Sequence, residues 1–474
     1  MLSCFAERAR SDEPAPARPN IVFILCDDLG INDLHCYGRK DHHTPNLDRL
    51  ASEGIRFTSA YCAQPICSAS RAAILTGIAP ARSHLTTYLP GRKDCSSQKL
   101  LQAEIETQVP LSVKMLPNYF KAAGYVCGAF GKWHVGGKGF GPLEHGFDVY
   151  HAGKSVTKPS DHEGGKGEYD LTQAAENFIE TNRNRPFLVY LAHYSPHIPY
   201  TAQQWRIAAN KGAFEPVYAG VIETLDDTVG RLLTRLDQLG LSKSTIVVFT
   251  SDNGGLHVPE GPHPRITYNA PFRAGKGYVY EGGLRIPLIV RWTGHIRAGK
   301  ITDTPVVNSG WIPTLLELAG LPAPSGLDGV SFAGLLLNQR GLPQRPLFWH
   351  FPHYTNQGSR PSGAMRDDKW MYVEYYDDED RKELYDLSKD PGERRNLAAQ
   401  EASRTARMHE ALQAWRNRVS ANENRPNPDF DPDKFRELYI DVDPGSFDPL
   451  RATKSEWEQM WSWRKEMNAA VRHR

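Results

Sequence analysis

The sequence has 474 residues, more than one hydrophobic core usually organises, and this length predicts two domains. Its formal net charge of +1, with 23% charged residues, excludes nucleic-acid binding through bulk charge, so any affinity for anions must be local. No apolar stretch approaches the ~18 residues of a membrane-spanning helix, so the sequence predicts no transmembrane span.

The first residues do not form a complete secretion signal. They lack the apolar stretch of a signal peptide, and a stretch rich in Pro, Ala and Arg follows them. We interpret residues 1–18 as a flexible leader or as the remnant of a truncated signal, and Cys4 fits a lipoprotein signal that starts upstream. The sequence contains no Asn-x-Ser/Thr acceptor, which favours a bacterial origin. We therefore expect a periplasmic or extracellular bacterial protein.

The cysteines are unevenly distributed along the chain. All seven lie in the first 127 residues, with no Cys-x-x-Cys pair and no zinc-binding spacing. An odd number of cysteines in a chain of this size argues against a complete disulfide framework. They occupy positions 4, 26, 36, 62, 67, 95 and 127.

Continuous apolar and β-branched runs predict strands that are buried on both faces. The predicted strands span residues 20–26, 126–130, 187–192, 245–250 and 286–290. Helical patterns alternate with them over residues 111–123, 170–181, 215–239 and 312–319. This alternation predicts an α/β sandwich around a large, mostly parallel central sheet, and we assign residues 19–325 to this domain.

A Gly- and Pro-rich passage over residues 320–326 marks a change in the character of the sequence. Beyond it we predict a smaller α+β domain over residues 326–474, with a short antiparallel sheet and a tail. Its predicted elements are strands 347–351 and 370–376, an amphipathic helix over 401–419, and a last helix that carries Trp457, Trp461 and Trp463.

Two of the predicted strands end in oxygen-bearing side chains. Asp27 and Asp28 follow the first strand, and Asp252 and Asn253 follow strand 245–250. The carboxyl ends of strands in an open α/β sheet form the ligand crevice, so we expect these side chains to meet. A single Asp after a strand is more often a cap or a turn, but aligned carboxylates would repel each other without a cation. Oxygen ligands of this kind select a hard cation and favour calcium over magnesium.

Lysine and histidine residues lie near the same predicted strand ends. Taken alone, each is more often a solvated lysine or a loop histidine. Together they supply the donors that a tetrahedral anion or a sulfate monoester needs, and an acid for the leaving oxygen. They are Lys132 and His134 after strand 126–130, His197 after strand 187–192, and Lys276 before strand 286–290.

Cys67 opens a helix-like segment in which Arg71 follows four residues later. A helix N-terminus attracts anions and lowers the pKa of a thiol, and Arg71 would reach back toward the cysteine. A phosphatase-type thiol site needs arginine six residues after the cysteine, where this chain has Ala73. The segment therefore indicates an anion site of another kind.

In their number and order, these motifs resemble those of type I sulfatases, the formylglycine-dependent members of the alkaline phosphatase superfamily. The resemblance extends from Pro19 to about Ala399. It implies an alkaline-phosphatase-like sandwich as the fold and hydrolysis of sulfate esters as the activity. The matching segments are 19–28, 44–48, 67–77, 131–134, 196–197, 251–254, 275–277, 281–283 and 383–391.

The resemblance also implies the nature of the nucleophile. A maturation enzyme would convert Cys67 to formylglycine, whose hydrated gem-diol attacks sulfur with one hydroxyl and expels sulfate with the other. One calcium ion would be held by the modified Cys67 and by the four oxygen ligands, Asp27, Asp28, Asp252 and Asn253. Proline most often stands two residues after the cysteine in this family, where this chain has Ala69. The extent to which a given host converts Cys67 is therefore open.

The same resemblance assigns roles to the cationic residues. Arg71 and Lys132 would position the formylglycine and stabilise its ionised hydroxyl. His134 would take up a proton in the elimination step. His197 and Lys276 would bind the sulfate and assist the departing oxygen.

Two other functions fit these motifs. A phosphodiesterase or phosphonate monoester hydrolase of the superfamily would use the same metal and nucleophile positions, and a sulfated-glycan-binding protein would keep Cys67 unmodified. The resemblance to bacterial sulfatases favours a sulfated carbohydrate as the substrate. Loop 153–167 and the tryptophan-bearing tail are candidate sugar contacts, although tryptophans at helical spacing more often pack against their own protein.

Overall fold

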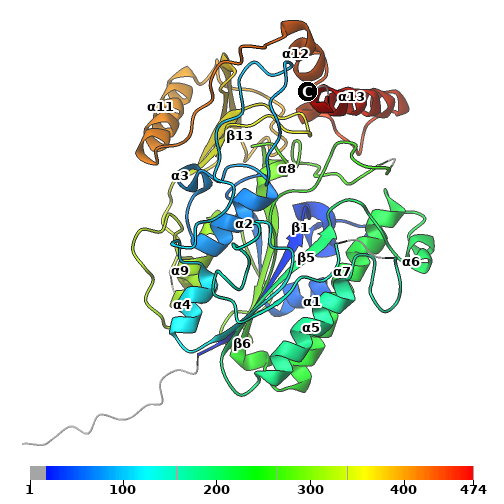
Figure 1. The fold of residues 1–474 in the computed structure, drawn as a ribbon, viewed down its shortest axis with the longest axis vertical. Coiled ribbons are helices and arrows are strands. Elements are labelled where there is room, and N and C mark those ends of the chain that lie inside the picture. Colours follow the sequence, from blue (N-terminus) through cyan, green and yellow to red (C-terminus); the bar gives the residue numbers. More distant parts are fainter. Residues whose placement is uncertain (1–17, 156–157, 264, 339, 473–474) are drawn as a thin grey trace, which may run out of the picture.

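The computed structural model describes residues 18–472 except 156–157, 264 and 339, so the predicted leader lies almost entirely outside the described residues. A nine-stranded sheet runs through the larger part of the molecule, with helices on both of its faces (Figure 1). Its strand order is β4-β3-β5-β1-β6-β7-β2-β8, and β9 pairs with β2. The bounds are β1 Asn20–Asp27, β2 Ile55–Tyr61, β3 Val126–Gly131, β4 Val149–His151, β5 Phe187–Pro196, β6 Thr245–Ser251, β7 Arg285–Arg291, β8 Lys300–Thr302 and β9 Val306–Val307.

The centre of this sheet is parallel, and the sheet becomes mixed toward one edge. Strand β1 lies between β5 and β6 and is parallel to both. Strand β7 is antiparallel to β6, and β2 is antiparallel to β7. The mostly parallel sheet is confirmed, but the direction of β7 could not be predicted, because a strand buried on both faces shows the same apolar run in either direction.

Helices bury both faces of the sheet. Successive side chains of β1 point to opposite faces, so Phe23 packs on the side of α2, α4 and α9 while Ile24 packs on the side of α1, α5 and α7. These two layers make the α/β sandwich that the alternation of strands and helices predicts. The helix bounds are α1 Pro45–Glu53, α2 Cys67–Thr76, α3 Pro80–Ser83, α4 Leu116–Ala122, α5 Glu168–Thr181, α6 Gln204–Ala209, α7 Pro216–Gln238, α8 Glu281–Leu284, α9 Trp311–Leu318 and α10 Ala333–Leu336.

The helix predicted over residues 111–123 is shorter in the structure, where α4 begins at Leu116. Pro117 explains the difference. Proline has no N–H to donate and is tolerated in the first turn of a helix but not in its middle. A helix that began at residue 111 would have placed Pro117 in its interior.

The C-terminal part contains the predicted antiparallel sheet, with four strands in sequential order. The helix α11 (Ala402–Arg418) covers one face of this sheet, and Met365, Leu384 and Leu412 belong to the apolar cluster between them. The other face joins the core of the larger part, where Trp349 donates its indole N–H to the carbonyl oxygen of Cys62 (2.9 Å). The strands are β10 Leu347–Phe351, β11 Ser362–Asp367, β12 Trp370–Tyr375 and β13 Asp378–Asp386.

The tail ends in two helices, α12 (Pro432–Tyr439) and α13 (Lys454–Arg472), beside the small sheet (Figure 1). Trp457 and Trp463 of α13 are buried, and Trp463 donates to the carbonyl oxygen of Leu438 (2.9 Å). These two tryptophans therefore pack against their own protein rather than presenting faces to a sugar.

Two expectations from the sequence concern membranes and disulfides. No helix in the part of the chain that the structure describes combines the length and apolar character needed to cross a bilayer. The described cysteines, at positions 26, 36, 62, 67, 95 and 127, all carry free thiols.

Candidate active site

The oxygen-bearing residues predicted to meet at the strand ends do so. Strands β1 and β6 are parallel neighbours, with Cys26 opposite Ser251, so the residues that follow them emerge side by side. The amide N–H of Asp28 donates to Oδ1 of Asp252 (3.1 Å). One ligand atom each from Asp27, Asp28, Asp252 and Cys67 lies within 4.8 Å of the others, and all four residues are buried.

Asn253 completes this set of oxygen donors. Its Nδ2 donates to Oδ1 of Asp28 (2.8 Å), whereas its Oδ1 is buried and has no hydrogen-bond partner. Buried polar atoms are normally satisfied, and an amide oxygen without a donor is available to a cation. Three carboxylates and this amide oxygen therefore fit a hard divalent cation.

Cys67 lies in the first turn of α2 and faces the carboxylates. Its Sγ is 3.5 Å from Oδ1 of Asp27 and 3.7 Å from Oδ1 of Asp28. Burial raises the pKa of the Cys67 thiol well above its usual value, although the charges of Lys132 and Lys276 act in the opposite direction. The helix N-terminus was expected to lower this pKa, but desolvation outweighs it. As an unmodified thiol, Cys67 is protonated and weakly nucleophilic.

Arg71 lies one turn after Cys67 on the same side of α2 and is fully buried. Its Nε donates to Oδ2 of Asp252 (2.7 Å), and its Nη1 donates to the carbonyl oxygen of Lys132 (3.2 Å). Nη2 lies 3.7 Å from Oδ1 of Asp27. Arg71 therefore links α2 to the strand ends and adds a fixed positive charge behind the carboxylates.

Each of the first two carboxylates is paired with a lysine. Nζ of Lys132 lies 2.6 Å from Oδ2 of Asp27, and Nζ of Lys276 lies 2.6 Å from Oδ2 of Asp28. Burial alone would raise the pKa of Asp27, but the neighbouring cations outweigh it, and the pKa of this carboxyl lies well below its usual range. Both aspartates are therefore ionised at neutral pH.

His134 is held in one tautomer by its surroundings. Its Nε2 lies 2.9 Å from the carbonyl oxygen of Leu89, which can only accept, so Nε2 carries the proton. Its Nδ1 is buried and has no hydrogen-bond partner. Burial, with the charge of Lys132, lowers the pKa of His134 to about 3. The ring is therefore neutral and offers a lone pair at Nδ1.

His197 has the complementary arrangement. Its Nδ1 lies 2.7 Å from the carbonyl oxygen of Ile198 and donates to it, while its Nε2 lies 3.7 Å from Oδ2 of Asp28. Burial and then the charge of Lys276 lower the pKa of His197. The free ring nitrogen thus faces the same carboxylate as Lys276.

Lys166 is a residue that the sequence did not single out. It belongs to the loop interpreted as a sugar contact, yet it is only 3% exposed. Its Nζ donates to the carbonyl oxygens of His197, Tyr194 (3.5 Å) and Ile198 (3.4 Å). The available signal in the sequence was the Gly-Gly-Lys-Gly run around it, since glycines allow close approach of backbone segments. The structure shows such an approach, because a Cβ at Gly165 would lie 1.8 Å from the carbonyl oxygen of Thr201.

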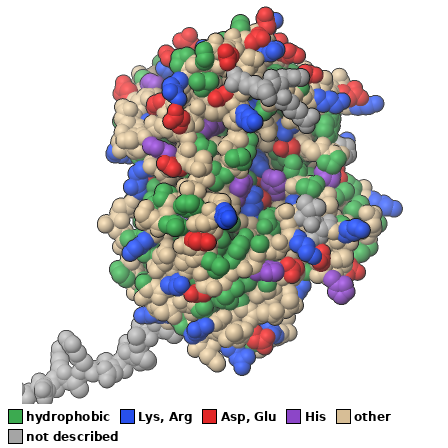
Figure 2. Space-filling model, viewed as in Figure 1, with side chains coloured by type: hydrophobic (Ala, Val, Ile, Leu, Met, Phe, Trp, Pro, Cys, Tyr) green, Lys and Arg blue, Asp and Glu red, His purple; other side chains and the backbone are tan. Residues whose placement is uncertain are grey.

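All predicted catalytic and metal-binding residues thus lie in one place, at the carboxyl ends of the central strands. Figure 2 shows His, Lys and Arg side chains gathered in a central depression on this face, in the region between α2, α8 and β1 of Figure 1. This position is the crevice expected for an α/β sheet.

Comparison with known proteins decides the family. A family model described as sulfatase matches residues 19–321, and one described as N-sulphoglucosamine sulphohydrolase, C-terminal, matches residues 274–418. The chain belongs to the sulfatase family. It is a sulfuric ester hydrolase of the alkaline phosphatase superfamily.

The sulfatase is similar to several named enzymes. It is 38% identical over 375 residues to N-acetylgalactosamine-6-sulfatase of Rattus norvegicus, covering 71% of this chain and 69% of the relative. It is 32% identical over 460 residues to arylsulfatase A of Homo sapiens, covering 83% and 86%. A solved structure of Ps i-CgsB in complex with k-i-k-neocarrahexaose matches with a TM-score of 0.73 and 25% identity, covering 94% and 98% of the two chains.

The loop that carries Asp252 and Asn253 packs backbone against backbone on α8, the short helix that follows the Lys276 loop in this sulfatase. A Cβ at Gly254 would lie 2.0 Å from the carbonyl oxygen of Gly282 and 2.9 Å from Cα of Gly283. The amide N–H of Gly254 donates to the carbonyl oxygen of Gly283 (3.0 Å). No side chain fits between this loop and α8 at Gly254, so their relative position is fixed by glycine.

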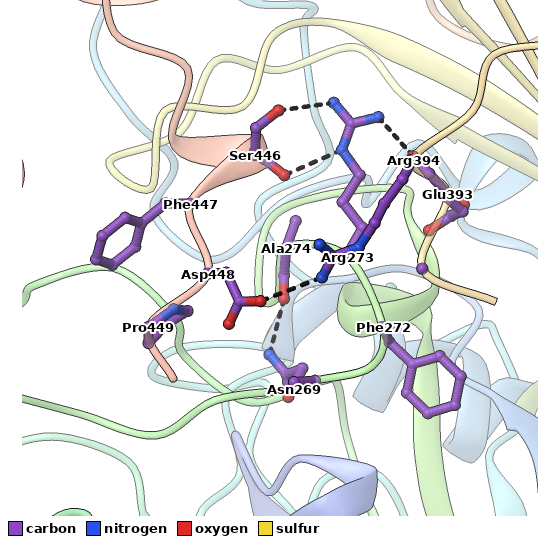
Figure 3. A pocket seen from close by; sticks show the side chains of 13 residues that line it. Asn269, Phe272, Arg273, Ala274, Glu393, Arg394, Ser446, Phe447, Asp448 and Pro449 are labelled. Atoms are coloured by element: carbon purple, nitrogen blue, oxygen red, sulfur yellow. Dashed lines mark hydrogen bonds and ion pairs between the residues drawn. The ribbon is translucent and has the colours of Figure 1, made fainter. Parts of the chain in front are cut away.

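A pocket of about 330 Å³ borders the loop before α8 (Figure 3). Arg273 is already engaged there, since its Nη1 donates to the hydroxyl of Tyr385 (2.9 Å) and its Nε donates to the carbonyl oxygen of Gly445 (3.1 Å). Arg394 likewise donates to Asp448 (3.1 Å). The pocket is a junction between this loop, the small sheet and the tail, and no predicted site residue lines it.

Proposed function

We propose that this sulfatase hydrolyses sulfate monoesters of a carbohydrate with a formylglycine made from Cys67 and a bound calcium ion. The convergence of the Cys67 Sγ and three carboxylates within 4.8 Å carries the proposal. The carbohydrate part is supported by similarity to a relative named for N-acetylgalactosamine-6-sulfate and to a structure solved with a neocarrahexaose.

The donor set supports calcium as the ion. Asp27, Asp28, Asp252 and Asn253 would hold it, and the orphaned amide oxygen of Asn253 is the observation that fits a cation. A bound calcium would stabilise negative charge on sulfate oxygens and on the ionised nucleophile. Lys132 and Lys276 lie 2.6 Å from Asp27 and Asp28, so both cations border the place at which a sulfate group would meet the ion.

The state of the Cys67 thiol supports its role as a precursor. Its pKa is raised by burial, so an unmodified cysteine here would be a poor nucleophile. Formylglycine, once hydrated, supplies a hydroxyl nucleophile and a second hydroxyl through which the sulfate group can be expelled. A thiol or serine has no such second hydroxyl.

The neighbouring residues divide the proton transfers. His134 is neutral with a free Nδ1 lone pair, so it is suited to accept a proton from the nucleophilic residue in the elimination step. Lys276 lies by Asp28 and is suited to donate to the departing oxygen. The Nε2 of His197 faces the same carboxylate and, as a lone pair, must first take up a proton before it can assist that oxygen. Arg71 and Lys132 supply fixed positive charge to the nucleophile.

The test is to produce the protein with and without a formylglycine-generating enzyme. Mass spectrometry of the tryptic peptide ending at Arg71 measures conversion of Cys67, and turnover of an aryl sulfate and an aryl phosphate measures activity. We expect sulfate turnover proportional to conversion, none for Cys67→Ala, and a clear preference for sulfate over phosphate. Full conversion with preference for the phosphate ester would refute the proposal. A native protein that carries only thiol would favour a glycan-binding role instead.

We also propose that residues 19–325 form the catalytic domain, residues 326–474 form the C-terminal domain, and the enzyme acts in the periplasm or outside a bacterial cell. A sulfated polysaccharide fragment is too large and too charged to cross a membrane unaided, which supports hydrolysis outside the cytoplasm. Fractionation of the native host with an antibody against this protein tests the location. Recovery only with cytoplasmic proteins would refute it.

A further inference from the structure

The segment that leads to Arg92 is attached directly to the active site. The amide N–H of Leu89 donates to Oγ of Ser68 in α2 (3.0 Å), and the carbonyl oxygen of Leu89 accepts from His134 (2.9 Å). Gly91 then turns the chain with a positive φ of 91°. Arg92 therefore lies only three residues after Leu89, whose carbonyl oxygen orients the proposed base His134.

Arg92 is a buried cation without a matching anion. It is 8% exposed, and among the described residues its hydrogen-bond partner is the side-chain oxygen of Asn356, which accepts from Nη1. Its Nε and Nη2 are buried and have no hydrogen-bond partner. No carboxylate of the described residues lies within 4.0 Å of it. A buried charge is normally paired, and unsatisfied donors at a buried guanidinium are costly.

A second arginine reaches the same asparagine from the C-terminal helix. Arg464 of α13 is 5% exposed; its Nη1 donates to the backbone carbonyl of Asn356, and its Nη2 lies 3.0 Å from Oε1 of Glu260. Its Nε has no partner. Two guanidinium groups and one carboxylate leave one positive charge in excess. Helix α13 lies beyond residue 418, where the second family match ends, so this arginine is contributed by the tail.

This cluster adjoins the proposed sulfate site. Glu260 accepts a hydrogen bond from Nε2 of Gln357 (2.8 Å), and a Cβ at Gly277 would lie 3.4 Å from Oε1 of Gln357. Gln357 thus borders the residue that follows Lys276. Burial raises the pKa of Tyr88, and the charges of Arg92, Glu260, Lys276 and Arg464 also act on it. Tyr88 and Glu260 are partly exposed, so the cluster is reachable from solvent.

We propose that Arg92 and Arg464 form a second anion subsite, which binds a carboxylate or an additional sulfate on the sugar chain whose ester is cleaved. This proposal rests on the proposed function in one respect, which is that the anion belongs to the sulfated sugar that the enzyme hydrolyses. Arg464 is fixed by Asn356 and Glu260, while Arg92 holds the larger number of free donors. Charge-assisted hydrogen bonds from guanidinium groups are directional, so this subsite selects substrates with two anionic groups over those with one.

The experiment compares Arg92→Gln and Arg464→Gln with wild type, and uses Lys465→Gln, an exposed residue next to Arg464, as the matched control. Three saccharide probes are used: N-acetylgalactosamine-6-sulfate, its 4,6-disulfate, and a disaccharide of glucuronate and 6-sulfated N-acetylgalactosamine. An aryl sulfate serves as a substrate without a second anion. The disulfate and the uronate disaccharide distinguish a sulfate from a carboxylate ligand.

We expect Arg92→Gln to lower kcat/KM by about 10- to 100-fold for one of the two doubly charged probes, because a lost charge-assisted hydrogen bond has that effect. Turnover of the aryl sulfate and of the singly sulfated sugar should change less than about 3-fold. Equal losses on all substrates, or no loss on any, would overturn the subsite. Arg92→Lys should retain part of the selectivity, which separates charge recognition from misfolding.

Binding is measured separately from hydrolysis, with Cys67→Ala protein and calorimetry of the same probes. Binding of a doubly charged probe that Arg92→Gln abolishes supports the subsite even if the matured enzyme hydrolyses no sulfate ester. Conversely, hydrolysis of sulfate esters without any effect of Arg92 or Arg464 on binding leaves the proposed function standing and refutes the subsite.

Discussion

The ammonium group of Lys276 lies 2.6 Å from Oδ2 of Asp28, and both side chains are almost completely buried. The partners are 248 residues apart in the chain, and their contact joins the loop before α8 to the end of β1. Burial alone would raise the pKa of Asp28, but Lys276 and His197 outweigh it and lower this pKa. The carboxylate is therefore ready to bind a cation while its lysine partner faces an incoming anion.

The first prediction is that calcium stabilises the folded enzyme. A ligand at about 100 times its Kd stabilises the native state by about 2.7 kcal/mol, which raises the melting temperature. Asp252→Asn should remove this calcium-dependent shift, because it weakens the donor set shared with Asp27 and Asp28. Thermal melts with calcium and with a chelator measure the effect. Asp433 is an exposed residue of α12, so Asp433→Asn should keep the full calcium-dependent shift. Loss of the shift in this variant would count against a specific site.

The second prediction concerns Lys166 as a positioning residue for His197. Lys166 donates to three carbonyl oxygens around His197, so Lys166→Met should loosen this loop. We expect kcat to fall by about 10- to 100-fold with a smaller change in KM, since the histidine proposed to assist the departing oxygen is displaced while the ground-state contacts remain. Lys154→Met on the same loop, where the lysine is exposed, should behave like wild type. A rise in KM alone would contradict the positioning role.

The third prediction is a pH dependence of stability that arises from His193. Burial lowers the pKa of His193 to about 3, whereas an unfolded histidine has a pKa of about 6.5. Between these values the unfolded chain binds a proton that the folded chain does not, so stability falls as the pH falls, by about 1.4 kcal/mol per pH unit at most. His193→Leu should reduce this slope in urea unfolding between about pH 6 and pH 4. The exposed His43→Leu should leave the slope unchanged, and an equal effect of both changes would rule out the assignment.

The fourth prediction concerns maturation. Ala69 lies in the first turn of α2, where backbone N–H groups lack helical partners and proline is tolerated. Ala69→Pro should therefore cost less than about 1 kcal/mol of stability and restore the motif most frequent in the family. We expect a larger converted fraction of Cys67 by mass spectrometry in the same host. An unchanged fraction with an unchanged melting temperature would show that Ala69 does not limit conversion.

The elements buried on both faces could be predicted from the sequence, because their apolar runs are continuous. The strands now seen as β1, β3, β5, β6 and β7 all belong to this class. Strand β2 escaped prediction, since its burial alternates near its start and it pairs at the antiparallel edge of the sheet. Strand order and the direction of β7 depend on contacts between distant segments, which no local pattern contains.

The candidate site was predictable for residues that follow strands, because strand ends meet by topology. Lys166 was not, since its function depends on the carbonyl groups that it reaches rather than on its own neighbours in the sequence. The pKa of Cys67 was also predicted in the wrong direction. The sequence shows the helix N-terminus, but the burial that dominates the thiol appears only when β1 and β6 close around it.

The contact between Gly254 and Gly282-Gly283 has a consequence for sequence variation. Neither Gly282 nor Gly283 carries a group that could bind a ligand or move a proton, and yet a Cβ at Gly254 would already lie 2.0 Å from the carbonyl oxygen of Gly282. The distance between the metal-ligand loop and α8 is thus set by the absence of a side chain at Gly254. Among relatives of this chain, a larger residue at Gly254 would mark a protein in which the metal-ligand loop and α8 have moved apart, even if every ligand and cation were retained.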